Sequence, residues 1–106
     1  MKMQVDAKTA KDVVVHAFGA DINTSDMTIS ESEINHEVKM FNDAVLFNVS
    51  IILARRDLDD CERWIYRVSC SDNATGNVLL KYVHPITNAV YNDQIRVDFE
   101  TLPFAA

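Results

Sequence analysis

INHEVKMFNDAVLFNVSI, residues 34–51, contains a hairpin whose two arms place apolar side chains on the same side. Folding back at Asn42-Asp43 sets apolar residues of one arm opposite apolar residues of the other. The apolar pairs are Met40 with Val45, Val38 with Phe47, His36 with Val49, and Ile34 with Ile51. The intervening pairs place Asn35, Glu37 and Lys39 opposite Ser50, Asn48 and Leu46. This pattern predicts an antiparallel sheet with one apolar and one mostly polar face, and it indicates no particular chemistry.

The size of the chain sets the number of domains. A chain of 106 residues is long enough for one core and too short for two. Its apolar content of 48% and charged content of 25% are typical of a folded protein. No repeat, low-complexity tract or linker divides the sequence. We therefore expect residues 1–106 to form a single globular domain.

The charge of the chain restricts its partners. The net charge is −6, from 16 acidic and 10 basic side chains, which disfavours binding to a phosphate backbone. The longest uncharged run, Ala44 to Ala54, is too short to span a bilayer. We therefore expect neither a nucleic-acid partner nor a membrane.

The two cysteines indicate a reducing compartment. Cys61 and Cys70 lie on either side of a predicted strand rather than in a CxxC pair, and the first residues do not resemble a signal peptide. Residues nine apart in an extended strand are too distant for a disulfide. This predicts free thiols and a cytoplasmic location.

Residues 9–20 allow two interpretations. Helical spacing of apolar residues, a cap from Thr9 with Asp12, and Gly19 as a stop favour a helix, with one side formed by Ala10, Val13, Val14, Ala17 and Phe18. The β-branched run Val13-Val14-Val15 instead favours a strand over residues 12–18, which would make the fold all-β. We predict the helix because the apolar side of the sheet needs a second layer.

Alternation continues after the hairpin. It predicts strands at Trp64–Cys70, Val78–His84 and Ile95–Glu100, with a turn-rich joint at Ser71–Asn77, whereas residues 21–32 resemble a connecting loop. A capping box at Ser30 and Glu33 offers a helical alternative for the first hairpin arm. The predicted fold class is α+β, an N-terminal helix packed on a five-stranded antiparallel meander sheet. This arrangement resembles cystatin-like and related helix-on-sheet folds, and such a resemblance carries no function by itself.

Catalytic and metal-binding patterns are weak in this sequence. His16, His36 and His84 lack the close spacing of metal ligands, and a hydrogen-bonded structural role is expected for His36 and His84. The charged segment from Arg55 to Arg63 lacks the glycine of a calcium loop, and two glycines in the whole chain exclude a phosphate-cradling loop. We therefore predict no catalytic residue, no metal and no cofactor, and a protein that is not an enzyme.

Two surfaces remain as candidates for binding. The predicted second face of the sheet mixes apolar and polar side chains, which suits a protein interface; the candidate residues are Leu46, Ile52, Ile65, Arg67, Leu79, Lys81 and Val83. The alternative is a small-ligand pocket or minor enzymatic site between helix and sheet, near His36, Trp64, Tyr66 and Tyr82.

The first surface favours a noncatalytic protein-interaction module. We expect a small accessory, inhibitory or adaptor protein of phage or bacterial origin that binds a different protein or forms a homo-oligomer. A structural subunit of a larger assembly is a third possibility.

Overall fold

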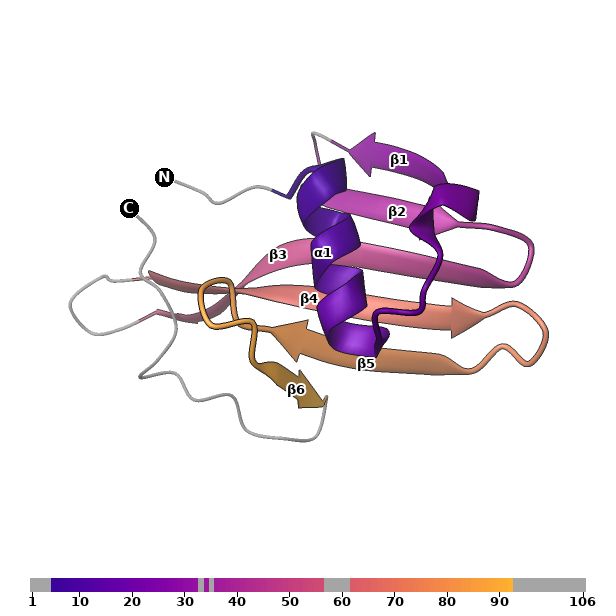
Figure 1. Cartoon of the computed structure of the whole chain (residues 1–106). Helices are drawn as coiled ribbons and strands as arrows, with labels where there is room; N and C mark the ends of the chain where they lie inside the picture. The colour runs from indigo at the N-terminus through magenta and orange to yellow at the C-terminus, as the bar shows by residue number, and fades with distance from the viewer. Residues whose placement is uncertain (1–4, 33, 35, 57–61, 93–106) are drawn as a thin grey trace.

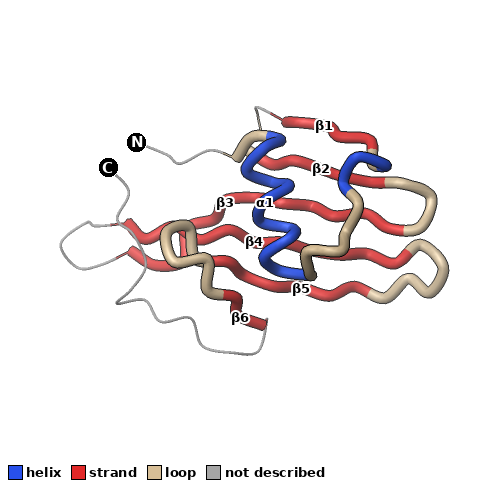
Figure 2. The backbone as a smooth tube through the Cα atoms, in the orientation of Figure 1, coloured by secondary structure: helices blue, strands red, loops and turns tan. Residues whose placement is uncertain are grey.

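The protein is one helix laid across an antiparallel sheet (Figures 1 and 2). The computed structural model describes residues 5–32, 34, 36–56 and 62–92. Within them lie one α-helix, one short 3-10 helix and a six-stranded sheet whose order β1-β2-β3-β4-β5-β6 follows the chain. Their bounds are α1 (Ala7–Phe18), η1 (Thr24–Asp26), β1 (Thr28–Ser32), β2 (Glu37–Phe41), β3 (Val45–Arg56), β4 (Glu62–Asp72), β5 (Val78–Val83) and β6 (Val90–Asn92). The α+β prediction is confirmed.

The strands differ from the prediction at both edges of the sheet. Strand β1 lies in the segment predicted as a loop, where Ile29 faces Met40 of β2 while most of its neighbours are small or polar. This polar edge lacks the apolar alternation by which a strand is recognised in a sequence. Strand β6 pairs with β5 and was also not predicted. The strand predicted at 95–100 lies outside the described residues.

Helix α1 begins and ends at identifiable residues. The Asp6 side chain caps its first turn by accepting a hydrogen bond from the Thr9 backbone N–H at 2.8 Å, so the predicted cap at Thr9 and Asp12 is wrong. The Gly19 N–H closes the last turn on the Val15 carbonyl, and glycine adopts the φ of +123° there without a Cβ penalty. The predicted stop at Gly19 is therefore confirmed.

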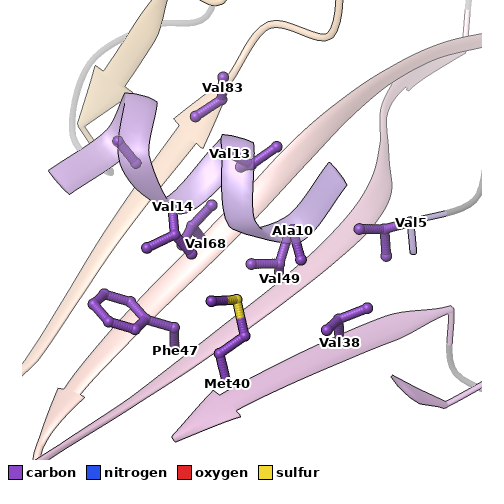
Figure 3. Packing of buried hydrophobic residues seen from close by; sticks show 11 residues of the cluster. Val5, Ala10, Val13, Val14, Val38, Met40, Phe47, Val49, Val68 and Val83 are labelled. Carbon is purple, nitrogen blue, oxygen red and sulfur yellow. The ribbon is translucent and has the colours of Figure 1, made fainter. Parts of the chain in front are cut away.

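The core lies between α1 and the sheet (Figure 3). Buried side chains of the helix pack against β2, β3, β4 and β5, so burial compensates for the low helix propensity of the valine run. The cluster consists of Val5, Ala10, Val13, Val14, Ala17, Val38, Met40, Phe47, Val49, Val68 and Val83. The all-β alternative is thereby excluded.

The first hairpin keeps the predicted faces in a different register. Val38 lies opposite Val49 and Met40 opposite Phe47, two positions away from the predicted partners. Asn42 is the reason, because its Oδ1 accepts hydrogen bonds from the N–H groups of Ala44 and Val45 and so starts the turn instead of forming its centre. A shift of two residues leaves the side chains of β2 on their predicted faces, whereas Ile34, predicted opposite Ile51, lies before β2 and is 90% exposed.

The second hairpin reverses the predicted faces of β5. Asp72 closes the turn by accepting from the Ala74 N–H, and its own N–H donates to the Asn77 carbonyl. As a result Tyr66 lies opposite Val83, and Arg67 lies opposite Tyr82. The prediction placed Tyr82 on the same face as Tyr66, and Val83 on the same face as Arg67. It is wrong because an odd shift in register exchanges the two faces of a strand.

Truncating a core side chain tests the packing. Met40 is fully buried, so Met40→Ala should reduce the free energy of unfolding by about 2–5 kcal/mol, measured by urea denaturation. Ser30→Ala, at an exposed position of the neighbouring strand, is the control and should change it by less than about 0.5 kcal/mol. Equal effects of the two substitutions would contradict the assigned core.

The cap at Asp6 predicts a pH-dependent stability. Hydrogen bonds from the Thr9 backbone and side chain lower the pKa of the Asp6 carboxyl in the folded protein. A lowered folded pKa adds stability above the ordinary aspartate pKa, and this stability disappears as the pH falls through the lowered value. Asp6→Ala should therefore lower the melting temperature at neutral pH, and its difference from the parent should shrink across that acidic window. Asp6→Asn keeps an acceptor and should retain most of the neutral-pH stability; a difference between the parent and Asp6→Ala that stays constant with pH would refute the charged cap.

Candidate functional site

The sheet face opposite α1, which we call the outer face, is the candidate site. Paired residues of antiparallel strands share a face, so the strand register lists its side chains in rows across the sheet. The central row is Ser32, Glu37, Ser50, Arg67, Tyr82 and Tyr91, the next is Ser30, Lys39, Asn48, Ser69 and Leu80, and a third is Thr28, Phe41, Leu46, Ser71 and Val78. On the other side of the central row, Ile52 pairs with Ile65.

The centre of the outer face is a polar hollow of about 150 Å³, lined by Glu37, Asn48, Ser50, Arg67 and Ser69. Lys39 Nζ lies 3.9 Å from Glu37 Oε1. The Arg67 side chain is exposed and has no ion-pair partner among the residues that the structure describes. Asn48 Oδ1 is buried and accepts no hydrogen bond. The hollow is therefore lined by a cation without an ion-pair partner among the described residues and by a side chain whose acceptor oxygen is buried and unsatisfied.

Apolar side chains border this hollow. Phe41 on β2 is 38% exposed and Val78 on β5 is 61% exposed, although both are large hydrophobic residues. Leu46 lies between their strands in the same row and is half-buried. A polar centre next to exposed apolar groups is a composition found in protein interfaces.

The structure places four of the seven predicted interface residues on the outer face. Leu46, Ile52 and Arg67 are at least partly accessible there, whereas Ile65 is only 1% exposed. The other three, Leu79, Lys81 and Val83, lie on the helix side, which corrects the prediction. The prediction assigned these three residues to the wrong face because it assumed a register between β4 and β5 that differs from the observed one by an odd number of residues.

Two of these helix-side residues, Val83 and Lys81, have structural contacts, whereas Leu79 is 59% exposed. Val83 is fully buried in the core, and Lys81 Nζ donates to the Ala17 carbonyl at 3.1 Å while lying 5.0 Å from the Phe18 ring centroid. Lysine thus binds a carbonyl at the helix C-terminus, where a cation is favourable. The outer-face residues that the prediction missed are Phe41, Val78, Leu80 and Tyr82, and knowledge of the second turn's register would have found the last three.

The four residues of the predicted ligand pocket do not come together. Trp64 and Tyr66 lie on the helix side of β4, whereas Tyr82 lies on the outer face. His36 belongs to the turn before β2 and has a positive φ of 52°. The Trp64 Nε1 donor is buried without a hydrogen-bond partner. The structure therefore offers no convergent aromatic site at these positions.

His84 has a structural role in the turn after β5. His84 is buried, and its Nδ1 accepts hydrogen bonds from the N–H groups of Ile86 and Thr87 at 3.1 Å, which confirms the predicted structural role.

The described residues contain no group of three or more His, Cys, Asp or Glu side chains able to hold a metal. In the same part of the chain, no helix is long and apolar enough to cross a membrane. Residues 57–61 of the charged segment, including Cys61, lie outside the described residues.

Two groups on the helix side have raised pKa values. Burial raises the pKa of the Tyr66 phenol, and the Asp6 carboxylate adds to this. Burial likewise raises the pKa of the Cys70 thiol, with a further contribution from Asp72. A nucleophilic cysteine needs a lowered pKa, so Cys70 has the opposite of a catalytic environment.

Alkylation tests this description of Cys70. In a Cys61→Ser variant, we expect the Cys70 thiol of the folded protein to react with iodoacetamide more slowly than the same thiol in urea, at equal pH, because less thiolate is present. The rates can be followed by mass spectrometry. A faster reaction in the folded protein would show an activated thiol and contradict the description.

Comparison of the chain with protein-family models, with curated proteins and with solved structures finds no match in any of the three. The functional argument therefore depends on the chain's own geometry. The outer face is where that geometry leaves charged, polar and apolar groups unsatisfied together.

Proposed function

We propose that the protein is a noncatalytic protein-interaction module, a small accessory, inhibitory or adaptor protein that binds its partner through the outer face. The observation that carries this proposal is the exposed Arg67, which has no ion-pair partner in the described part of the chain, in one hollow with Asn48, whose Oδ1 is buried and unsatisfied. An unsatisfied buried acceptor is costly, and a partner toward which the Asn48 amide can turn removes the cost by supplying a donor.

The apolar groups of the outer face support a protein as the partner. An antiparallel sheet can expose one face to water, and that face is then expected to be polar. Phe41 and Val78 depart from this expectation because large apolar side chains are exposed there. A protein surface satisfies both the polar centre and its apolar border. The chain's net charge of −6 supports the further expectation that nucleic acid is not the partner.

The size of the hollow argues against a small ligand bound within it. Its volume of about 150 Å³ is below the ~300–1,000 Å³ of typical ligand pockets. The aromatic residues of the alternative pocket are also divided between the two faces of the sheet. A subunit of a larger assembly remains compatible with the proposal, because it would use the same face. A cytoplasmic location is part of the proposal and is supported by the free thiol of Cys70.

Site-specific photo-crosslinking tests the proposal. A photoreactive amino acid at Ser50, in the centre of the outer face, should form an adduct with a protein in cells that make the natural protein. The same amino acid at Lys8, exposed on α1, is the control and should not form that adduct. The crosslinked protein can be a different protein or a second copy of this chain, and either result supports the proposal.

The captured protein is then identified by mass spectrometry, purified and titrated with the chain. Arg67→Glu should weaken this binding by about tenfold or more, because it reverses the unpaired charge of the face, whereas Lys8→Glu should leave it unchanged. Equal adducts from Ser50 and Lys8, or binding indifferent to Arg67→Glu, would show that the outer face is not the interface.

A further inference from the structure

We propose that the outer face binds a second copy of the chain, face to face, across a two-fold axis parallel to β3. This inference rests on the proposed function and names the partner of that same face. It follows from the positions of the charged and polar residues in the rows across β2, β3 and β4.

Consider two sheets whose outer faces meet, with a two-fold axis midway between them and parallel to β3. Rotation about this axis reverses the order of the strands from one copy to the other. Strand β2 of one copy then faces β4 of the other, and β3 faces β3, while each residue keeps its position along the strand. Glu37, Ser50 and Arg67 are consecutive in one row across these strands. Glu37 of each copy therefore faces Arg67 of the other, and the pair occurs twice. Arg67, which has no ion-pair partner among the described residues, thereby acquires one.

Asn48 supplies an independent reason for this axis. It lies on β3, in the row next to Ser50, so the axis sets it opposite Asn48 of the second copy. The amide of one Asn48 can donate through Nδ2 to the Oδ1 of the other. Oδ1 is shielded from solvent and accepts no hydrogen bond from the described residues, so the Asn48 side chain must turn toward the second copy for dimer formation to satisfy it.

The apolar residues of β3 match across the same axis. Leu46 and Ile52 lie on the outer face on either side of Asn48 and Ser50, and each faces itself in the second copy. Thr28, at the edge of the sheet, faces the exposed Val78. Sheets that pack face to face in this way keep their strands within about 30° of each other.

The charge of the outer face permits self-association although the chain is acidic. The rows named above contain one acidic residue, Glu37, and two basic residues, Lys39 and Arg67, whereas the whole chain carries −6. The acidic surplus therefore lies elsewhere, and two outer faces can approach each other without strong repulsion. The main rival is an axis perpendicular to the strands, which would pair Glu37 with Lys39 and leave Arg67 alone.

Charge reversal with sedimentation equilibrium tests the axis. The parent chain should be a dimer, and Glu37→Arg or Arg67→Glu should each weaken it by about 100-fold, because each substitution sets like charges opposite each other twice. An equimolar mixture of the two variants should form a heterodimer, since both contacts are then opposite in charge. The double variant E37R/R67E should dimerise like the parent.

Lys39→Glu is the matched control. It reverses a charge on the same face and faces Ser69 of the second copy, so it should change the dissociation constant far less than Arg67→Glu. Circular dichroism checks that each variant is folded, and the heterodimer provides a second check. Loss of the dimer in Lys39→Glu with no effect of Arg67→Glu would overturn the proposed axis in favour of the rival.

Three further outcomes decide between this inference and the proposed function. A parent chain that is monomeric at all concentrations overturns the dimer, and an adduct of Ser50 with a different protein then leaves the proposed function standing. A dimer that is indifferent to both charge reversals also overturns the axis, because its interface lies elsewhere. A monomer without any adduct at Ser50 refutes both.

Discussion

The structure depends on one contact, the packing of α1 against the sheet (Figure 1). A single helix of 12 residues can cover only one face of the sheet, and it does so with Ala10, Val13, Val14 and Ala17. Their burial against β2, β3, β4 and β5 outweighs the poor helix propensity of consecutive valines. The same contact defines the two faces, because every alternate side chain is directed away from the helix.

The outer face is therefore a consequence of the core. Packing under α1 fixes which side of each strand is buried, and the opposite side must accommodate whatever residues alternate with the core. In this protein those residues are a charged and polar centre with an apolar border. Arg67 and Asn48 Oδ1, which have no partner among the described residues, lie on this face, whereas Trp64 Nε1 is a buried donor without a hydrogen-bond partner on the helix side. This division of roles favours recognition of another protein over chemistry within a pocket.

Local patterns predicted much of the fold but only part of the candidate site. Alternation identified β2, β3, β4 and β5, and helical spacing identified α1, because each has a buried side that repeats along the chain. Strand β1 was not predicted, because its residues are mostly polar and it pairs with a neighbour on one side only. On the outer face, Leu46, Ile52, Ile65 and Arg67 were placed correctly, whereas Leu79, Lys81 and Val83 were not. The error arose in the Asp72–Asn77 turn, where side-chain hydrogen bonds set the register.

The sequence by itself predicted the sheet and determined which side chains of each strand share a face, whereas the valine run left residues 12–18 open to a strand until burial against the sheet decided for the helix. Only the tertiary structure decided how neighbouring strands align. Register is set by hydrogen bonds between segments and by turn geometry, which periodicity within one strand does not contain. A shift of two residues in the first hairpin was therefore harmless, whereas an odd shift in the second moved Tyr82 to the outer face. The row that joins Glu37, Ser50 and Arg67 exists only because three strands align in this way.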